Sequence, residues 1–111
     1  VIMKIDKSLL SGSTALLVLS LLSESDKYGY QMIGDLALRS ENVFEFKEGT
    51  LYPVLHALEK EGALRSYEKE APSGRTRRYY SITAKGRRLL SEKREQWGQF
   101  ARAVELIVGR A

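Results

Sequence analysis

The sequence lacks the features that mark several large classes of protein. It contains no cysteine, which excludes a disulfide framework and a thiolate metal site. Its longest apolar run, Ala15 to Leu19, is far too short to span a bilayer, and no signal-peptide pattern opens the chain. We therefore expect a cytoplasmic protein that binds no membrane, metal or cofactor.

Catalytic patterns are missing as well. The single histidine, His56, has no cysteine as a partner, and the serines and acids near it lack the spacing of a catalytic triad. No glycine-rich phosphate loop follows a predicted strand. Glu59 and Glu61 belong to a solvated helix face and do not form a poised carboxylate pair. The sequence therefore predicts a protein without enzymatic activity.

The chain has the length of a single domain with a small core. Its 111 residues, 43% of them hydrophobic, leave apolar surface that self-association would cover. The net charge of +4 is compatible with binding to nucleic acid but does not indicate it. The placement of the charges is more informative, because Arg75, Arg77 and Arg78 follow closely after Gly74.

Three helical segments occupy the first half of the chain. The leucines from Leu9 to Leu22 are too dense for a one-faced helix, which predicts a helix buried on more than one side. Apolar residues recur at helical spacing from Tyr28 to Arg39, and a third helix starts at Gly49 and ends at Gly62. Three short helices at this spacing predict a helix-turn-helix.

The next segment alternates with the period of a β-strand. Residues Leu64 to Lys69 and Arg75 to Ile82 alternate, and the loop between them is rich in turn-forming residues. Arg77 is predicted on one face of the second strand and Tyr80 on the other. A two-stranded β-hairpin with a basic tip, directly after a helix-turn-helix, is typical of the wing of a winged helix.

A final helix is predicted from Ala84 to Ala111, capped by Thr83 and about 40 Å long at about 1.5 Å per residue. An apolar stripe runs along this helix with a seven-residue repeat and consists of Leu90, Trp97, Phe100, Val104, Ile107 and Val108. The stripe has two interpretations, because it either folds back onto its own domain or forms the seam of a dimer. The length of the helix favours the dimer seam.

Together these elements predict a mostly helical α+β fold. Residues 9–83 form a winged helix-turn-helix with a two-stranded β-wing, and residues 84–111 form a long C-terminal dimerisation helix within the same compact unit. We expect the first part to bind DNA and the second part to bind another copy of the chain.

Four stretches of the sequence resemble the motifs of one family. Residues 28–33 (YGYQMI) look like the aromatic-glycine start of its second helix, and residues 48–59 (EGTLYPVLHALE) look like its recognition helix. Residues 74–83 (GRTRRYYSIT) look like its wing, which runs into the last helix at residues 83–86 (TAKG). The family is that of the PadR transcriptional regulators, and the resemblance covers nearly the whole chain from Leu9 onward.

The resemblance implies a cytoplasmic transcription regulator, often a repressor, that dimerises through its last helix and parts of its first. The short C-terminus resembles the subgroup with a single long final helix. One departure is Ala57, where many family members carry an arginine. This difference takes away one phosphate contact that the family resemblance would imply.

The third helix is the expected recognition element. Its polar face carries Thr50, Tyr52 and His56, which we expect to contact the groove or its backbone. Lys47 and Lys60 are expected to lie nearer to phosphates. Two alternatives stay open, because the ring of Tyr52 also fits a place under the wing and His56 also fits an ordinary surface position.

The arginines of the predicted wing are the second expected DNA contact. Arg75, Arg77 and Arg78 would reach a flanking minor groove or its phosphates, which a guanidinium binds well. Side chains alternate along a strand, so Arg77 and Arg78 cannot face the same way, and Arg75 and Arg77 are favoured. The alternative is a solvated hairpin tip without a ligand.

The expected partners follow from a two-fold arrangement. A homodimer would present two recognition helices to the half-sites of a palindromic operator in double-stranded DNA, about 34–36 Å apart. Trp97 has two interpretations, a packing residue at the seam or a platform for a small flat aromatic effector that relieves repression. The competing hypothesis is a winged-helix module that binds proteins and not DNA, although three arginines in the wing favour DNA.

Overall fold

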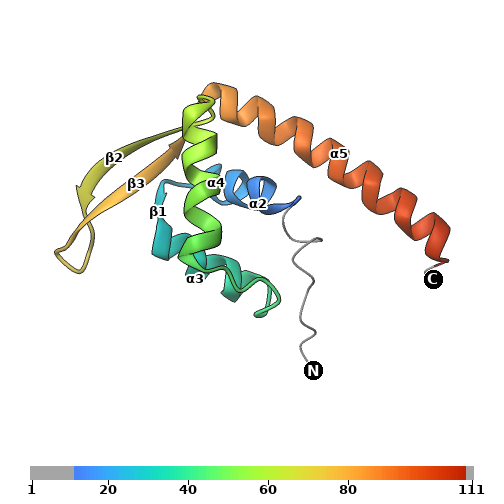
Figure 1. Ribbon diagram of the computed structural model, residues 1–111, viewed down its shortest axis with the longest axis horizontal. Coiled ribbons are helices and arrows are strands. Elements are labelled where there is room, and N and C mark those ends of the chain that lie inside the picture. The colour runs from blue at the N-terminus through green and yellow to red at the C-terminus, as the bar shows by residue number, and fades with distance from the viewer. Residues whose placement is uncertain (1–11, 110–111) are drawn as a thin grey trace.

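The computed structural model describes residues 12–109 of the chain. Its elements, in chain order, are α2 (Thr14–Leu22), β1 (Lys27–Tyr28), α3 (Gly29–Arg39), α4 (Glu48–Lys60), β2 (Leu64–Glu70), β3 (Thr76–Ile82) and α5 (Ala84–Val108). Helices α2, α3 and α4 form a compact body, from which the β-hairpin extends on one side and α5 on the other (Figure 1). This architecture confirms the predicted winged helix-turn-helix with a long C-terminal helix.

The hairpin belongs to a three-stranded antiparallel sheet in the order β1-β3-β2. Strands β2 and β3 pair along their full seven residues, and the short β1 adds to the other edge of β3, with Tyr28 opposite Tyr79. The sequence predicts the hairpin but not β1. It predicts a helix from Tyr28, whereas α3 begins at Gly29, because the backbone of Tyr28 is extended and paired with β3.

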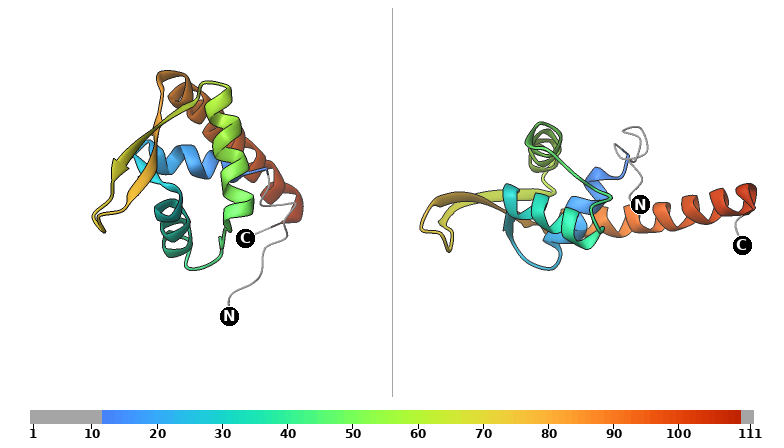
Figure 2. Two further views of the ribbon diagram at one scale, coloured as in Figure 1. Left: turned by 60° about the vertical axis from the view of Figure 1, so that its left-hand side comes forward. Right: turned by 90° about the horizontal axis from the view of Figure 1, so that it is seen from below.

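One cluster of buried side chains joins the helices to the sheet. Helix α4 contributes Leu51, Leu55 and Leu58, whose spacing of i, i+4 and i+7 places them on one side of the helix. Helix α2 contacts α3, α4, α5 and β3, so it is buried on more than one side, as its dense leucines predict (Figure 2). Tyr80 of β3 is almost fully enclosed in this core.

The first and last helices differ in length from the prediction. The predicted first helix starts at Leu9, which lies outside the described residues; residues 12–13 form a turn, and α2 begins at Thr14. Helix α5 ends where Gly109 adopts a left-handed φ of 70°, a common way to terminate a helix. Residues 110–111, which the prediction includes in this helix, lie outside the described part of the chain.

The start of α5 is held against the turn that joins α4 to β2. The Thr83 hydroxyl oxygen accepts a hydrogen bond from the Gly86 backbone N–H at 3.0 Å, so Thr83 caps the helix as predicted. The same hydroxyl lies 2.7 Å from the carbonyl oxygen of Gly62. A side chain at position 86 would overlap the carbonyl oxygen of Ala63, so this close approach requires glycine. Leu90 is still buried in the core, and beyond it α5 projects away from the domain (Figure 2).

Replacing Gly86 by alanine is expected to lower the free energy of unfolding by roughly 1–3 kcal/mol, because the added methyl group displaces α5 from the backbone of Ala63. Gly34→Ala is the matched control. Gly34 lies on the exposed side of α3 with open space around it, so alanine should raise the free energy of unfolding by about 0.4–1 kcal/mol. Urea unfolding followed by circular dichroism, at one protein concentration, measures both changes. Equal effects of the two substitutions would contradict the close approach at Gly86.

Candidate nucleic-acid interface

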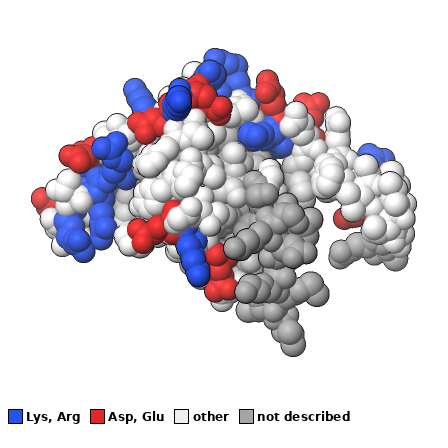
Figure 3. Space-filling view, in the orientation of Figure 1, with Lys and Arg blue, Asp and Glu red and all other residues white. Residues whose placement is uncertain are grey.

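The outer face of α4 lies beside the hairpin and carries several of the predicted contact residues. Thr50, His56 and Lys60 are exposed on this helix, and Lys47, also exposed, directly precedes it. The first turn of a helix has backbone N–H groups without partners inside the helix, and these favour an anion. Figure 3 shows lysine and arginine side chains gathered over the neighbouring hairpin, with acidic side chains between them.

Tyr52 lies at the border between the exposed face of α4 and the core. Its ring packs over the start of α3, where a side chain at Gly29 would overlap the Tyr52 ring and hydroxyl. Burial raises the pKa of Tyr52, so its hydroxyl stays protonated. The ring centroid lies 6.3 Å from that of His56. Tyr52 therefore joins α4 to the residue that follows β1, while part of its side chain stays accessible.

Arg75 is the wing arginine at the hairpin tip, and its side chain is exposed. The turn beneath it is tight, because the Ala71 N–H donates to the carbonyl oxygen of Arg75 at 2.8 Å and the Gly74 N–H donates to that of Ala71 at 2.8 Å. Gly74 has a φ of 89°, which favours glycine at this position. Arg75, a predicted DNA contact, is therefore an exposed cation on a hydrogen-bonded turn.

Arg78 points toward α4. Its guanidinium donates to the Ser66 hydroxyl at 3.0 Å, and that hydroxyl donates to Glu59 Oε2 at 2.6 Å. These bonds tie both strands of the hairpin to the second half of α4. Arg78 is thus engaged within the protein and does not lie at the tip with Arg75.

Arg77 lies on the opposite face of β3 and turns toward the start of α3. Its guanidinium carbon is 5.4 Å from the ring centroid of Tyr28 and 5.5 Å from that of Tyr30. Both distances are within the range of cation–π attraction. The Nε atom of Arg77 is buried and has no hydrogen-bond partner among residues 12–109. The three arginines that the sequence groups together therefore occupy three different environments.

The outer face of the sheet carries an aromatic cluster that the sequence patterns do not predict. Tyr67 stacks on Tyr79 with ring centroids 5.8 Å apart, and Tyr28 meets Tyr79 edge-on at 5.3 Å. The Tyr67 hydroxyl donates to Asp26 Oδ2 at 2.5 Å, which raises the pKa of Tyr67 and ties β2 to the segment before β1. Lys69 lies 5.0 Å from the Tyr79 ring centroid. The signal for this cluster is the strand period combined with the hairpin register, which pairs Tyr67 with Tyr79.

The apolar stripe of α5 divides into a buried and an exposed part. Leu90 is 3% exposed and belongs to the core of its own domain, whereas Ile107 is 86% exposed. The rings of Trp97 and Phe100 lie side by side, with centroids 6.1 Å apart. Leu106, which the predicted stripe leaves out, is also exposed. The exposed apolar part of α5 consists of Trp97, Phe100, Val104, Leu106, Ile107 and Val108.

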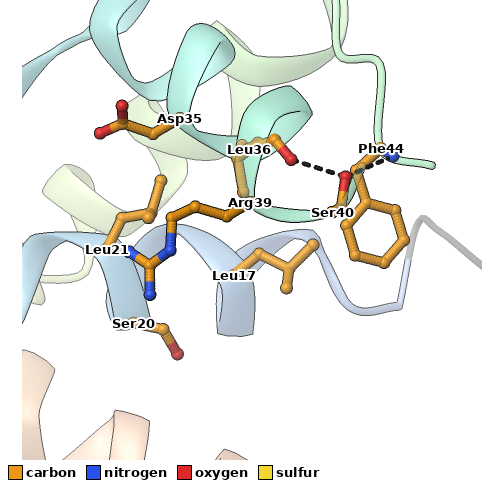
Figure 4. A pocket seen from close by; sticks show the side chains of 8 residues that line it. All are labelled: Leu17, Ser20, Leu21, Asp35, Leu36, Arg39, Ser40 and Phe44. Carbon is orange, nitrogen blue, oxygen red and sulfur yellow. Dashed lines mark hydrogen bonds between the residues drawn. The ribbon is translucent and has the colours of Figure 1, made fainter. Parts of the chain in front are cut away.

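A pocket of 170 Å³ lies between α2, α3 and the segment after α3 (Figure 4). Its charged side chains are paired within the protein. Arg39 binds both carboxylate oxygens of Glu24, at 2.7 and 2.9 Å, and Asp35 binds Lys27 at 2.9 Å. The Ser40 hydroxyl also bridges two backbone groups across the end of α3. The polar groups of this pocket therefore hold α3 in place and leave no free charge for a ligand.

Metal-site and membrane features are absent from the part of the chain that the structure describes. Among residues 12–109, no group of at least three histidine, aspartate or glutamate side chains is arranged to hold a metal ion. Within the same residues, no helix combines the length and the apolar character needed to cross a membrane. Three surfaces are candidates for binding a partner: the exposed face of α4, the hairpin and the exposed apolar part of α5.

The chain is similar to known proteins over most of its length. Residues 18–92 match the model of a family described as the transcriptional regulator PadR-like family. A transcriptional regulator from Clostridium thermocellum has a TM-score of 0.85 and 32% identity, covering 94% of this chain and 98% of that one. A PadR family transcriptional regulator from Eggerthella lenta has a TM-score of 0.75 and 34% identity, covering 91% and 82%. A transcriptional regulator of Mycobacterium tuberculosis is 43% identical over 65 residues, which are 59% of this chain and 60% of its own.

Proposed function

Because the chain belongs to the PadR-like family of transcriptional regulators, we propose that it binds a palindromic operator as a homodimer and represses transcription. It is a DNA-binding regulator and not an enzyme, as its motifs predict. Repression and a cytoplasmic location are what the family resemblance implies. The observation that carries the proposal is the exposed face of α4 beside a hairpin with an exposed arginine at its tip.

Docking of α4 in the major groove is the arrangement that these surfaces support. Thr50 is exposed in the first turn of α4, where its hydroxyl and the helix dipole favour a phosphate. His56 faces solvent further along the helix and is available to base edges. Lys47 and Lys60, near the two ends of α4, would neutralise phosphates on either side. Tyr52 would contact the backbone with the accessible part of its side chain.

The wing would contact the DNA next to α4. Arg75 is exposed at the tip and would reach the adjacent minor groove or its phosphates. Arg78 is exposed beside α4, and its guanidinium makes one hydrogen bond, to Ser66. Its proposed role is to attach the hairpin to α4 and to offer its other N–H groups to a phosphate.

Arg75→Ala is expected to weaken binding about equally for all DNA sequences and to reduce the slope of log affinity against log salt by about 1, because one phosphate contact is lost. Arg102→Ala removes the same charge from the exposed surface of α5 and should leave the slope unchanged. Fluorescence anisotropy at several salt concentrations measures both, with a duplex from the region upstream of the protein's gene and a scrambled duplex.

The wild-type protein supplies the decisive comparison in this experiment. A preference for the upstream duplex supports the operator proposal. Equal and weak binding to both duplexes would contradict it and would favour a winged-helix module that binds proteins. If Arg75→Ala and Arg102→Ala reduce the slope of log affinity against log salt equally, the proposed contact between Arg75 and DNA is contradicted.

The exposed apolar part of α5 supports self-association. Each of its six side chains is at least 40% exposed in a single copy of the chain, which is unusual for a small domain that works alone. We place a symmetric pair of α5 helices at this surface. Such a dimer would present two α4 helices to half-sites one turn of DNA apart, about 34–36 Å.

Ile107→Glu is expected to raise the dissociation constant of the dimer about tenfold or more, because a charge would be buried in an apolar seam. Leu38→Glu is the matched control, since Leu38 on α3 is 77% exposed and lies outside the proposed seam. Sedimentation equilibrium measures the dissociation constants. A monomeric wild-type protein, or equal dissociation of both variants, would contradict the α5 seam.

Trp97 and Phe100 support a regulatory role for the same seam. Their adjacent rings are 50% and 60% exposed, and they offer a stacking platform for a flat aromatic compound. A ligand that prefers one angle between the subunits would shift the dimer away from the spacing that fits DNA. Relief of repression would follow from this shift.

A planar quinoline is expected to quench the fluorescence of Trp97, which is the single tryptophan, and to lower the affinity for the operator. Phe100→Ala should weaken the quenching, because one side of the stacking platform is lost. Tyr67→Leu removes an exposed ring from the hairpin and should leave the quenching unchanged. Quenching without any loss of DNA affinity would refute the regulatory role.

A further inference from the structure

Two tyrosines at the start of α3 hold the side chain of Arg77. Tyr28 forms the end of β1 and Tyr30 lies in the first turn of α3, so both rings come from one short segment. The guanidinium carbon lies 5.4 Å and 5.5 Å from their centroids. The Nε atom of Arg77 is buried and has no hydrogen-bond partner among residues 12–109. The contacts with the two tyrosine rings therefore account for the position of the Arg77 guanidinium.

The same tyrosines place the charge of Arg77 beside the N-terminus of α4. A hydrogen bond with Glu48, the first residue of α4, raises the pKa of Tyr30, and the charge of Arg77 opposes this shift. At Tyr52, burial raises the pKa most, Glu48 adds to the shift, and Arg77 again opposes it. The geometry agrees, because Gly29, between the two tyrosines that stack on Arg77, lies against the ring of Tyr52 in the first turns of α4.

We infer that Tyr28 and Tyr30 are positioning residues that hold Arg77 as a cation for the DNA backbone next to the N-terminus of α4. This inference rests on the proposed function, because it requires that α4 and the wing contact DNA. Arg77 then contacts the same stretch of backbone as Thr50, and Arg75 serves the flanking groove. A guanidinium that is already stacked loses less side-chain freedom when it binds a phosphate.

Removing the ring that holds Arg77 tests the inference. Tyr30→Leu is expected to lower DNA affinity roughly 2- to 10-fold, the effect of one long side chain that must be ordered on binding. Tyr30→Phe keeps the ring that stacks on Arg77 and loses only the hydroxyl bonded to Glu48, so its loss of affinity should be smaller than that of Tyr30→Leu. In an Arg77→Ala background, Tyr30→Leu should cause no further loss. In an Arg75→Ala background, the two losses should multiply, because these sites are independent.

The salt dependence separates positioning from charge. Arg77→Ala should reduce the slope of log affinity against log salt by about 1, because a phosphate contact is lost. Tyr30→Leu should leave the slope nearly unchanged, because the charge of Arg77 remains. Arg77→Lys keeps the charge but lacks the planar group that stacks on tyrosine, so it should resemble Tyr30→Leu.

The outcomes distinguish this inference from the proposed function. If the wild-type protein prefers the upstream duplex but the losses at Tyr30 and Arg77 multiply, the positioning role is overturned and operator binding stands. If Tyr30→Leu still weakens binding in the Arg77→Ala background and lowers the urea midpoint, Tyr30 serves the stability of the fold alone. A wild-type protein without sequence preference overturns both.

Discussion

Strand β3 is paired on both of its edges and buries Tyr79 and Tyr80 on opposite faces. Tyr80 fills the core that the helices share, while Tyr79 anchors the aromatic cluster with Tyr28 and Tyr67. A two-stranded hairpin alone is at best marginally stable in water. The orientation of the wing relative to α4 therefore comes from these two sets of contacts, and the surface offered to DNA depends on side chains buried beneath it.

Two close approaches position α4 from its other sides. Gly29 allows the ring of Tyr52 to lie against the start of α3, and Gly86 allows α5 to begin against Ala63, three residues beyond the end of α4. A methyl group at either glycine would require a rigid ring or the backbone to move. Helix α4 is thus held by α3 near its first turns and by the α5 junction near its last.

Periodicity predicts the elements well and the contacts between them poorly. Apolar spacing predicts the ends of α3 and α4 to within two residues, and strand alternation predicts the hairpin, because both patterns depend on near neighbours along the chain. Strand β1 is too short to leave a periodic signal. The three wing arginines look alike in sequence, and their separation depends on Tyr30 and Ser66, which come from other segments. The repeat on α5 likewise treats Leu90 and Trp97 as equivalent, although Leu90 packs in its own domain.

Helix α5 is packed against the rest of the domain only near its N-terminal end. Its buried residues are Gly86 and Leu90 in the first turns, and the remainder of its 25 residues extends outward. A tilt of about 5° at the attachment would move the far end of a helix about 37 Å long by roughly 3 Å. The contact between Gly86 and Ala63 opposes a tilt toward the turn that joins α4 to β2. A tilt of α5 in that direction would therefore have to displace the backbone of Ala63, three residues beyond the end of α4.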